Sequence, residues 1–293
     1  MKTLKVFLLL SFLSSSLLVL SQKNDTIKRI RNTSLIIGGG SIVSFTGLYQ
    51  VWYKNYPSSK LHVFNDSKNW LQMDKLGHVY TANKLSHLFY NTYKRTGINN
   101  TKAALIGSSL GLGFQTTIEI MDGYSEGWGF SWSDMAANTI GSVGFLLQQL
   151  KWNENKFLLK FSYHNTKYAA VRPEVLGSNF SERFLKDYNG QTYWLSFSPN
   201  LLFKRVPKWA CLSIGYSVDE KLVGNKEYYF DPISNQEYFS SRQFFLSLDI
   251  DFSQLPIKRE WLKKIVQQFN YLKVPFPTLM LNNNSASFKG IYF

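Results

Sequence analysis

The spacing of apolar residues changes near Trp152, and this change constrains the fold more than any other feature of the 293-residue chain. Before Trp152, apolar residues recur every three to four positions, as in helices that bury one side. After it they alternate with polar residues, as in strands whose two faces differ. The chain is therefore predicted to be an α+β protein, with an N-terminal bundle of about four helices followed by a C-terminal antiparallel β-sheet.

The first half should contain four helices separated by turn-forming residues. They are expected over 34–53, 74–95, 101–121 and 133–152. Three of them are rich in small residues, which let helix backbones approach closely. The first is uncharged and long enough to span a membrane, but the second carries Asp, Lys and Arg side chains unsuited to a lipid-facing span. A compact or membrane-seated bundle is therefore favoured over a fully spanning one.

The second half should contain an antiparallel sheet of short strands. Alternation is clearest over 210–218 and 244–252. Weaker alternation marks three more segments, which are 156–163, 193–199 and 287–293.

An amphipathic helix is expected over 257–272, before Pro275 and Pro277 end the element. Its apolar face includes Trp261 and Phe269, and its polar face is basic. The basic residues on that face include Lys263 and Lys264. Such a helix can lie in a lipid headgroup layer, which makes these four residues candidate membrane contacts, or it can simply cover the sheet. Both interpretations remain open at this point.

Residues 1–21 have the pattern of a cleavable secretory signal. Two lysines precede an apolar stretch over 6–20, and small residues stand just before Gln22. The stretch is shorter than the roughly 20 residues of a membrane span, which favours cleavage over anchoring. The mature chain would then comprise a helical domain over 22–152 and a sheet domain over 153–293.

Charge and cysteine content bound the location and the partners. The formal net charge is +14, which in an exported protein favours anionic lipid or an envelope polymer as a partner, with an envelope protein as a further possibility and no nucleic acid. Cys211 is the only cysteine, so no intrachain disulfide is expected, and no cysteine follows the signal for lipid attachment. We expect the periplasm or the periplasmic face of the outer membrane, with the inner membrane as the alternative.

Polar residues are expected to converge inside the helical bundle. Asp74 and His78 lie four residues apart at the start of the second helix, on a face that is otherwise mostly apolar. The third and fourth helices carry further polar residues on inward stripes, which are Gln115, Glu119, Asp122, Asp134 and Asn138. Buried carboxylates are costly unless they are paired or hydrogen-bonded, so this convergence needs a structural or chemical reason.

Each of these residues also has a simpler interpretation. Asp74 can favour the positive end of its helix dipole, and Ser131 with Asp134 fits a capping box. If the residues instead form a site, the candidate catalytic residues are His78, Glu119 and Asp134, with His78 as acid or base. These three could also bind a metal, but no zinc motif or nucleotide fingerprint is present, so no metal is assigned and the cofactor is unknown.

The order of these polar residues carries a resemblance. It comprises Asp74-Lys75-Leu76-Gly77-His78, then Glu119 with Asp122-Gly123, then Ser133-Asp134 through Asn138 to Gly141. It resembles the uncharacterised YfiM-like family of predicted periplasmic proteins, and it is more distantly similar to VanZ-like membrane proteins. The resemblance covers about residues 70–145 and implies an envelope location and a site, but no reaction. The chain departs from these families in having no lipoprotein cysteine after the signal and no arginine in the loop before Asp134.

Two main classes of function remain open from the sequence, with a pore or transport accessory as a third. One is an exported, membrane-associated envelope protein of unknown activity that binds lipid, glycan or an envelope protein. The other is a hydrolase-type enzyme that acts on a lipid-linked or cell-wall substrate through His78, Glu119 and Asp134. A cluster that opens into a cleft would favour the enzyme, whereas a paired cluster closed to solvent would favour the first class.

Overall fold

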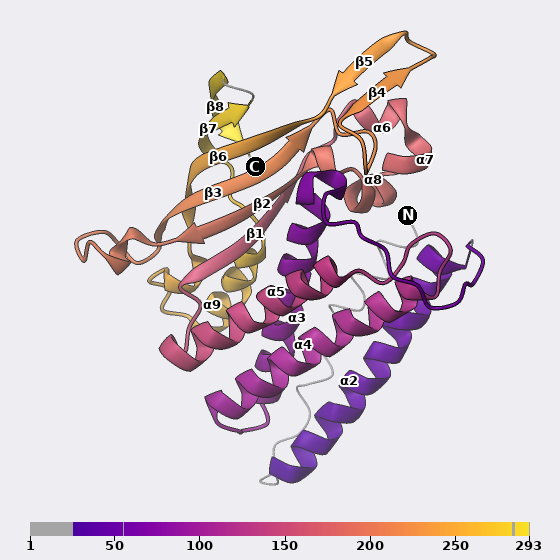
Figure 1. Cartoon of the computed structure of the whole chain (residues 1–293). Helices are drawn as coiled ribbons and strands as arrows, with labels where there is room; N and C mark the ends of the chain where they lie inside the picture. The colour runs from indigo at the N-terminus through magenta and orange to yellow at the C-terminus, as the bar shows by residue number, and fades with distance from the viewer. Residues whose placement is uncertain (1–25, 55, 283–284, 293) are drawn as a thin grey trace.

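A computed structural model describes residues 26–292 except residues 55 and 283–284 (Figure 1). The helices come first and the antiparallel sheet second, which confirms the predicted α+β class and the order of its parts. The expected signal over 1–21 and the expected start at Gln22 lie outside the described residues.

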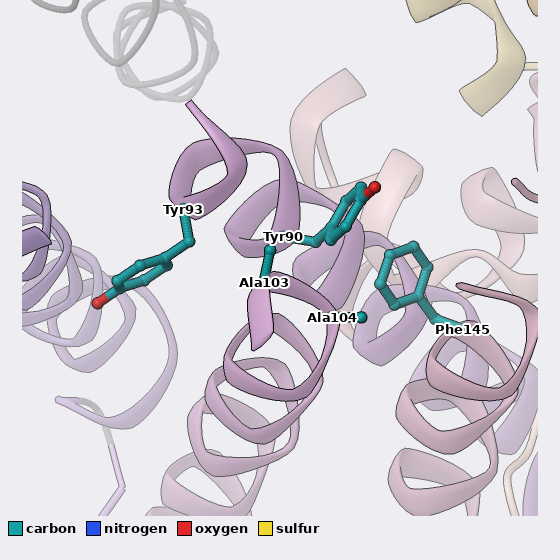
Figure 2. Close-up of a cluster of buried hydrophobic side chains, with 5 residues drawn as sticks. All are labelled: Tyr90, Tyr93, Ala103, Ala104 and Phe145. Atoms are coloured by element: carbon teal, nitrogen blue, oxygen red, sulfur yellow. The ribbon is translucent and has the colours of Figure 1, made fainter. Parts of the chain in front are cut away.

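The first part of the chain forms four long helices. They are α2 (Thr26–Leu48), which continues into a π-helical turn (Tyr49–Tyr53), α3 (Met73–Lys94), α4 (Asn100–Gly123) and α5 (Trp132–Trp152). A core around Tyr90, Ala104 and Phe145 joins α3, α4 and α5 (Figure 2). Helix α2 is already helical at Thr26, the first described residue, whereas the prediction starts at residue 34, so α2 includes basic residues. Within the described ranges, no helix is both long and apolar enough to cross a membrane.

Small residues bring α3 close to its neighbours. A Cβ atom on Gly107 would lie 2.5 Å from the backbone nitrogen of Tyr90 and 2.8 Å from the carbonyl oxygen of Ser86. Gly111 and Gly141 face α3 just as tightly, whereas Gly113 has open space around it. Close approach therefore depends on particular glycines rather than on small residues in general.

The second part forms a six-stranded antiparallel sheet. In spatial order its strands are β1 (Phe157–Tyr163), β2 (Gln191–Phe197), β3 (Ala210–Asp219), β6 (Ser241–Ile250), β7 (Phe276–Asn282) and β8 (Ser285–Tyr292). A separate hairpin pairs β4 (Tyr228–Asp231) with β5 (Gln236–Phe239). Three short helices separate β1 from β2, which are α6 (Tyr168–Val171), α7 (Pro173–Leu176) and α8 (Phe180–Lys186).

Strand β7 was not predicted from the sequence, because Pro275 and Pro277 indicated the end of an element rather than a strand. Proline cannot donate to a β-ladder, so it is tolerated mainly at edges and bulges. The pairing of β7 with β8 shifts register between Phe276 and Thr278, which places Pro277 at such an irregularity.

The amphipathic helix is shorter than the predicted range 257–272. It comprises α9 (Glu260–Val266) followed by a 3-10 turn (Gln267–Tyr271). The side chain of Asn270 accepts a hydrogen bond from the backbone nitrogen of Phe252 (2.8 Å) and donates one to Asp251 (2.9 Å). These bonds tie the turn to the chain that follows β6, and the regular helix ends before it.

The buried face of the sheet is polar. Lys160 and Asp249 form an ion pair of 3.0 Å with no exposed side-chain surface, and Ser196 donates to the same carboxylate at 2.6 Å. The sheet curls around this interior, because the ring of Tyr292 in β8 lies 6.1 Å from that of Trp194 in β2. The alternation predicts the strands, but the residues that it buries are mostly polar, with Trp194 and Phe245 as the large apolar exceptions.

The opposite face of the sheet is apolar, and it is covered only in part. One row of directly opposed residues crosses five strands: Leu195, Ile214, Leu246, Leu279 and Phe288. Their exposed fractions range from 37% to 66%. Helix α3 packs beside β1 and β2, where Tyr80 contacts Phe161 and Tyr193 (both 5.9 Å between ring centroids). The helices therefore cover one side of this face and leave the rest open.

Candidate functional site

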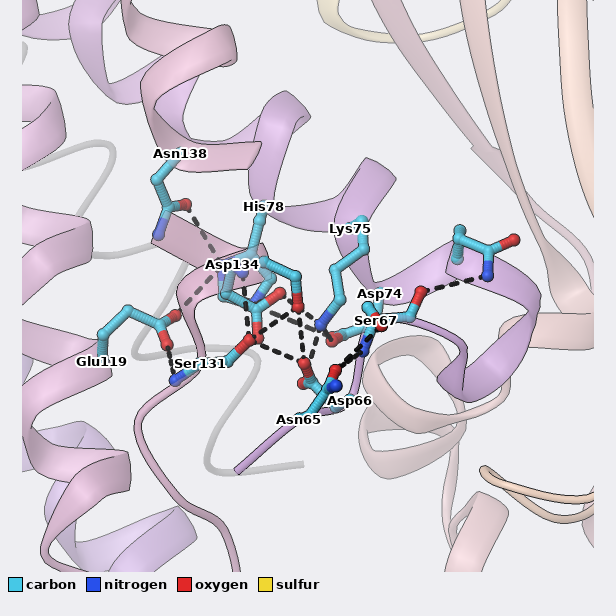
Figure 3. Close-up of polar contacts among 12 residues, drawn as sticks. Asn65, Asp66, Ser67, Asp74, Lys75, His78, Glu119, Ser131, Asp134 and Asn138 are labelled. Atoms are coloured by element: carbon cyan, nitrogen blue, oxygen red, sulfur yellow. Dashed lines mark hydrogen bonds and ion pairs between the residues drawn. The ribbon is translucent and has the colours of Figure 1, made fainter. Parts of the chain in front are cut away.

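The ammonium of Lys75 lies at the centre of a cluster of carboxylates at the start of α3 (Figure 3). Its Nζ is 2.7 Å from Asp66, 3.0 Å from Asp74 and 2.5 Å from Asp134. These carboxylates come from the loop before α3, from α3 itself and from the first turn of α5. One partly buried cation thus joins three segments of the chain.

His78 lies on the same side of α3, one turn further along. Its Nδ1 donates to Oδ1 of Asn138 (3.1 Å) and lies 3.4 Å from Oε1 of Glu119. Its Nε2 lies 3.6 Å from Asp134 and 3.8 Å from Asp74. The structure therefore places His78 within 4 Å of Glu119 and Asp134, the two carboxylates with which it was grouped as a candidate site.

The two other predicted cluster residues lie at its edge. Gln115 donates from Nε2 to Oδ1 of Asn138 (3.0 Å) and so belongs to the same network. Asp122 instead accepts a hydrogen bond from the Tyr53 hydroxyl (2.6 Å), which ties the end of α4 to the turn after α2.

Ser131 combines a capping role with a place in the cluster. As the N-cap of α5, its Oγ accepts from the backbone nitrogen of Asp134 (3.1 Å). The same hydroxyl donates to Asp66 (2.6 Å), and its backbone nitrogen donates to Glu119 (3.4 Å). The capping interpretation and the cluster interpretation are therefore compatible.

The sheet half also reaches the cluster. Tyr188, in the 3-10 turn before β2 (Tyr188–Gly190), donates from its hydroxyl to Oδ1 of Asp74 (2.9 Å). Sequence reasoning missed Tyr188 and Asp66 as members, since neither lies on a periodic stripe of the bundle. Lys75 directly follows Asp74 in the segment from Asp74 to His78, and this position beside Asp74 was the available signal that Lys75 belongs to the cluster.

Burial and charge shift the pKa values of the cluster in opposite directions. Burial raises the pKa of Glu119 to about 8 and that of Asp134 to about 6. Although burial opposes ionisation of Asp66, hydrogen bonds from Lys75, Ser131 and Ser133 lower its pKa to about 2. For His78, burial favours the neutral ring, but the neighbouring carboxylates outweigh it and raise the pKa. The cluster therefore combines carboxyl groups whose ionisation burial opposes with one, Asp66, whose ionised form is favoured.

The arrangement combines possible metal ligands with a resident cation. One ligand atom each from Asp74, His78 and Asp134 lie within 4.8 Å of one another. However, the Lys75 ammonium already bonds to both of those carboxylates. Access is limited as well, since the exposed fractions of the Glu119 and His78 side chains are 1% and 17%. The geometry is that of a polar cluster largely closed to solvent and joined by ion pairs, in which Gln115 Oε1, Glu119 Oε1 and Asn138 Nδ2 are buried without a hydrogen-bond partner among the described residues.

Comparison with known proteins identifies only the segment that contains this cluster. Residues 63–149 match the model of a family described as predicted periplasmic lipoprotein (DUF2279). No curated protein and no solved structure matches the chain. This description of an uncharacterised, predicted periplasmic family agrees with the expected location, although the match does not establish the finer YfiM-like or VanZ-like resemblance. The single cysteine, Cys211, is buried in β3.

Proposed function

We propose that this protein is a membrane-seated component of the cell envelope whose sheet contacts lipid through its outer apolar face. The observation that carries the proposal is the reversed polarity of the sheet. Antiparallel sheets with one face in water normally expose polar residues and bury apolar ones. Here Lys160 and Asp249 are buried while Leu246 and Leu279 are about half exposed. Such a face is stable when its surroundings are apolar.

The outer face presents several exposed apolar residues together rather than a single one, and this supports contact with lipid. Fully burying a Leu, Ile or Phe side chain stabilises by about 1.5–3 kcal/mol, so a half-exposed one can still contribute about 1 kcal/mol. The row from Leu195 to Phe288 has one such residue on each of five strands. Together they can supply several kcal/mol on transfer into acyl chains.

Basic and aromatic residues gather at one end of the sheet, where headgroups would lie. In the loop after β2, Leu202 and Phe203 are exposed beside Lys204, Arg205 and Lys208. On the same end, the apolar residues of α9 and of the turn after it point outward, with exposed fractions of 51–59%. They are Trp261, Ile265, Phe269 and Leu272. A helix that only covered the sheet would bury these side chains, so this arrangement favours contact with an anionic headgroup layer.

The hydrolase alternative has less support. A general acid or base must come within hydrogen-bond reach of its substrate. Glu119 is buried and His78 is enclosed by Asn138, Asp74 and Asp134. The match of residues 63–149 to a family described as predicted periplasmic lipoprotein is in keeping with a place on the periplasmic face of the outer membrane, and it favours neither function over the other.

Vesicle binding of the purified protein tests the proposal. Leu246→Lys combined with Leu279→Lys places two charges on the outer face of the sheet. Partition into phosphatidylglycerol–phosphatidylethanolamine vesicles should fall at least about tenfold, which corresponds to ~1.4 kcal/mol. The control is Ile233→Lys, at a 94% exposed turn position between β4 and β5, which should bind as the unaltered protein does. Equal binding of a folded double variant would show that the sheet does not contact lipid.

A further inference from the structure

An apolar groove lies where the two halves of the protein meet. Its volume is about 230 Å³, and α3 lines one side of it with Leu76, Val79 and Tyr80. The outer face of the sheet lines the other side, with residues that include Ile214 and Phe244. Apolar cavities of about 150 Å³ are large enough to bind a small hydrocarbon ring, so this groove has room for part of a hydrocarbon chain.

The groove is continuous with the open face of the sheet. Ile214 and Phe244, which line it, are about half exposed. Ile214 pairs directly with Leu246 on the next strand, so the groove is the inner end of the row that we propose contacts lipid. A chain could therefore pass from the bilayer into the groove without crossing a polar surface.

A lysine without a carboxylate partner stands one helical turn beyond Tyr80. The Lys84 ammonium lies 5.2 Å from the ring centroid of Tyr80 and 4.9 Å from that of Tyr271. Over the described residues it makes no ion pair, unlike Lys75 and Lys160. Burial, with a smaller contribution from Lys160, lowers its pKa to about 7. An anionic group beside it would supply the missing counter-charge.

We propose that the groove binds one acyl chain of an anionic membrane lipid and that Lys84 pairs with the phosphate of its headgroup. This inference rests on the proposed membrane contact, but it adds a discrete site with a stoichiometry of one lipid for each protein chain. The aromatic rings of Tyr80 and Tyr271 would flank the headgroup, as tyrosines commonly do at membrane interfaces.

Binding of the fluorescent fatty acid cis-parinaric acid to the purified protein tests the groove. The unaltered protein should bind it saturably at one site. Val79→Phe fills the groove and should weaken binding about tenfold, or ~1.4 kcal/mol. The matched control is Leu248→Phe, which adds a similar side chain to the same sheet face outside the groove and should change little. Equal affinity of Val79→Phe and the unaltered protein would overturn the proposal.

A second variant guards against misfolding. Ile214→Asp places a carboxylate in the groove at a position that is 51% exposed, so it should fold even if Val79→Phe does not. It should also weaken parinaric acid binding about tenfold. If it folds and binds normally, the groove is not the site.

The role of Lys84 is tested by competition. Lysophosphatidylglycerol, below its micelle concentration, should displace the probe more readily than neutral monoacylglycerol of the same chain length does. Lys84→Met should remove that preference and leave the monoacylglycerol affinity unchanged. An unchanged preference would overturn the assignment of the headgroup to Lys84.

The two proposals fail in different ways. Val79→Phe should keep the vesicle binding of the unaltered protein, because the outer row remains intact. Saturable probe binding without vesicle binding would refute the membrane proposal and leave a soluble-lipid site. Vesicle binding without a saturable site for the probe would refute the groove and leave the membrane contact.

Discussion

The hydroxyl of Tyr188 donates a 2.9 Å hydrogen bond to Oδ1 of Asp74 and thereby joins the sheet half of the protein to the polar cluster of the helical half. Asp74 also bonds to Lys75, so the tyrosine completes a network that begins in the loop before α3. A helical domain without the sheet would leave this carboxylate with one partner fewer. The two halves should therefore stabilise each other.

Tyr188→Phe tests this mutual stabilisation. A hydrogen bond to a charged group contributes about 1.5–3 kcal/mol, so the free energy of unfolding should fall by that amount. Urea unfolding followed by circular dichroism measures it. Tyr228→Phe removes an equivalent hydroxyl that bonds to Glu237 on the exposed hairpin, and it should cost less than about 0.5 kcal/mol. Similar losses for both variants would mean that the contact does not couple the halves.

The polar cluster should behave as one energetic unit. Removing one partner from a buried charge network leaves the others uncompensated, so His78→Ala and Asp134→Ala should each cost about 3–5 kcal/mol. The double variant should cost clearly less than the sum, because the two residues lie 3.6 Å apart. A double-mutant cycle on the free energy of unfolding measures this coupling.

A distant pair provides the control for that cycle. Asp231 lies outside the cluster, in the β4–β5 hairpin. Its carboxylate accepts hydrogen bonds from the backbone nitrogen and the hydroxyl of Ser234 in the turn. Asp231→Ala combined with His78→Ala should therefore be additive within about 0.5 kcal/mol. Additive losses of about 1 kcal/mol each for His78→Ala and Asp134→Ala would instead indicate separate capping roles.

Two glycines on α4 should respond to alanine in opposite directions. Gly107→Ala places a Cβ 2.5 Å from the backbone of Tyr90, so it should force the helices apart and cost at least ~1–3 kcal/mol. Gly113→Ala has open space and gains helix propensity, which should stabilise by up to about 1 kcal/mol. Thermal unfolding of both variants compares them directly, and a neutral Gly107→Ala would contradict the close packing of α3 on α4.

The segment from α9 to Tyr271 should add to membrane affinity. Trp261→Ala with Phe269→Ala removes exposed apolar surface, and Lys263→Glu with Lys264→Glu reverses basic charge. Both pairs should reduce binding to anionic vesicles, at about 1 kcal/mol for each basic residue near the surface, and the charge variants should lose less at high salt. Unchanged binding by folded variants would leave the segment as a cover for the end of the sheet.

Periodicity made the four long helices, five of the six sheet strands and the fold class predictable, because the pattern of each of these elements is local, whereas the short helices α6 to α8 and the β4–β5 hairpin were not predicted. Which face of the sheet is buried was not predictable in this way. Alternation such as that of Leu246, Ser247 and Leu248 shows that two faces differ, but it does not show which one other segments cover. Here Lys160, Asp249 and the serines face inward, and their pairing depends on strands that are far apart in sequence.

The residues of the polar cluster also divide into those that the local pattern predicts and those that it does not. The positions of Asp74, His78, Glu119 and Asp134 follow from helix spacing, and the structure brings them together. Asp66 and Tyr188 reach the cluster from a loop and from a turn before β2, where no periodic signal exists. Their contribution depends on tertiary packing and could not be derived from local pattern.

The curl of the sheet also sets an order on folding. Thr192 and Tyr292 are 100 residues apart in sequence, yet their hydroxyls lie 3.2 Å from each other. Contacts this distant close late, because a long loop must be restricted before they form. Until β8 pairs with β7, the ring of Tyr292 cannot pack against Trp194 and Phe245 in the interior of the sheet. The helices make contacts that are closer in sequence and can form earlier, whereas the sheet closes only when β8 pairs, so a molecule cut before β8 would carry an open, aggregation-prone sheet.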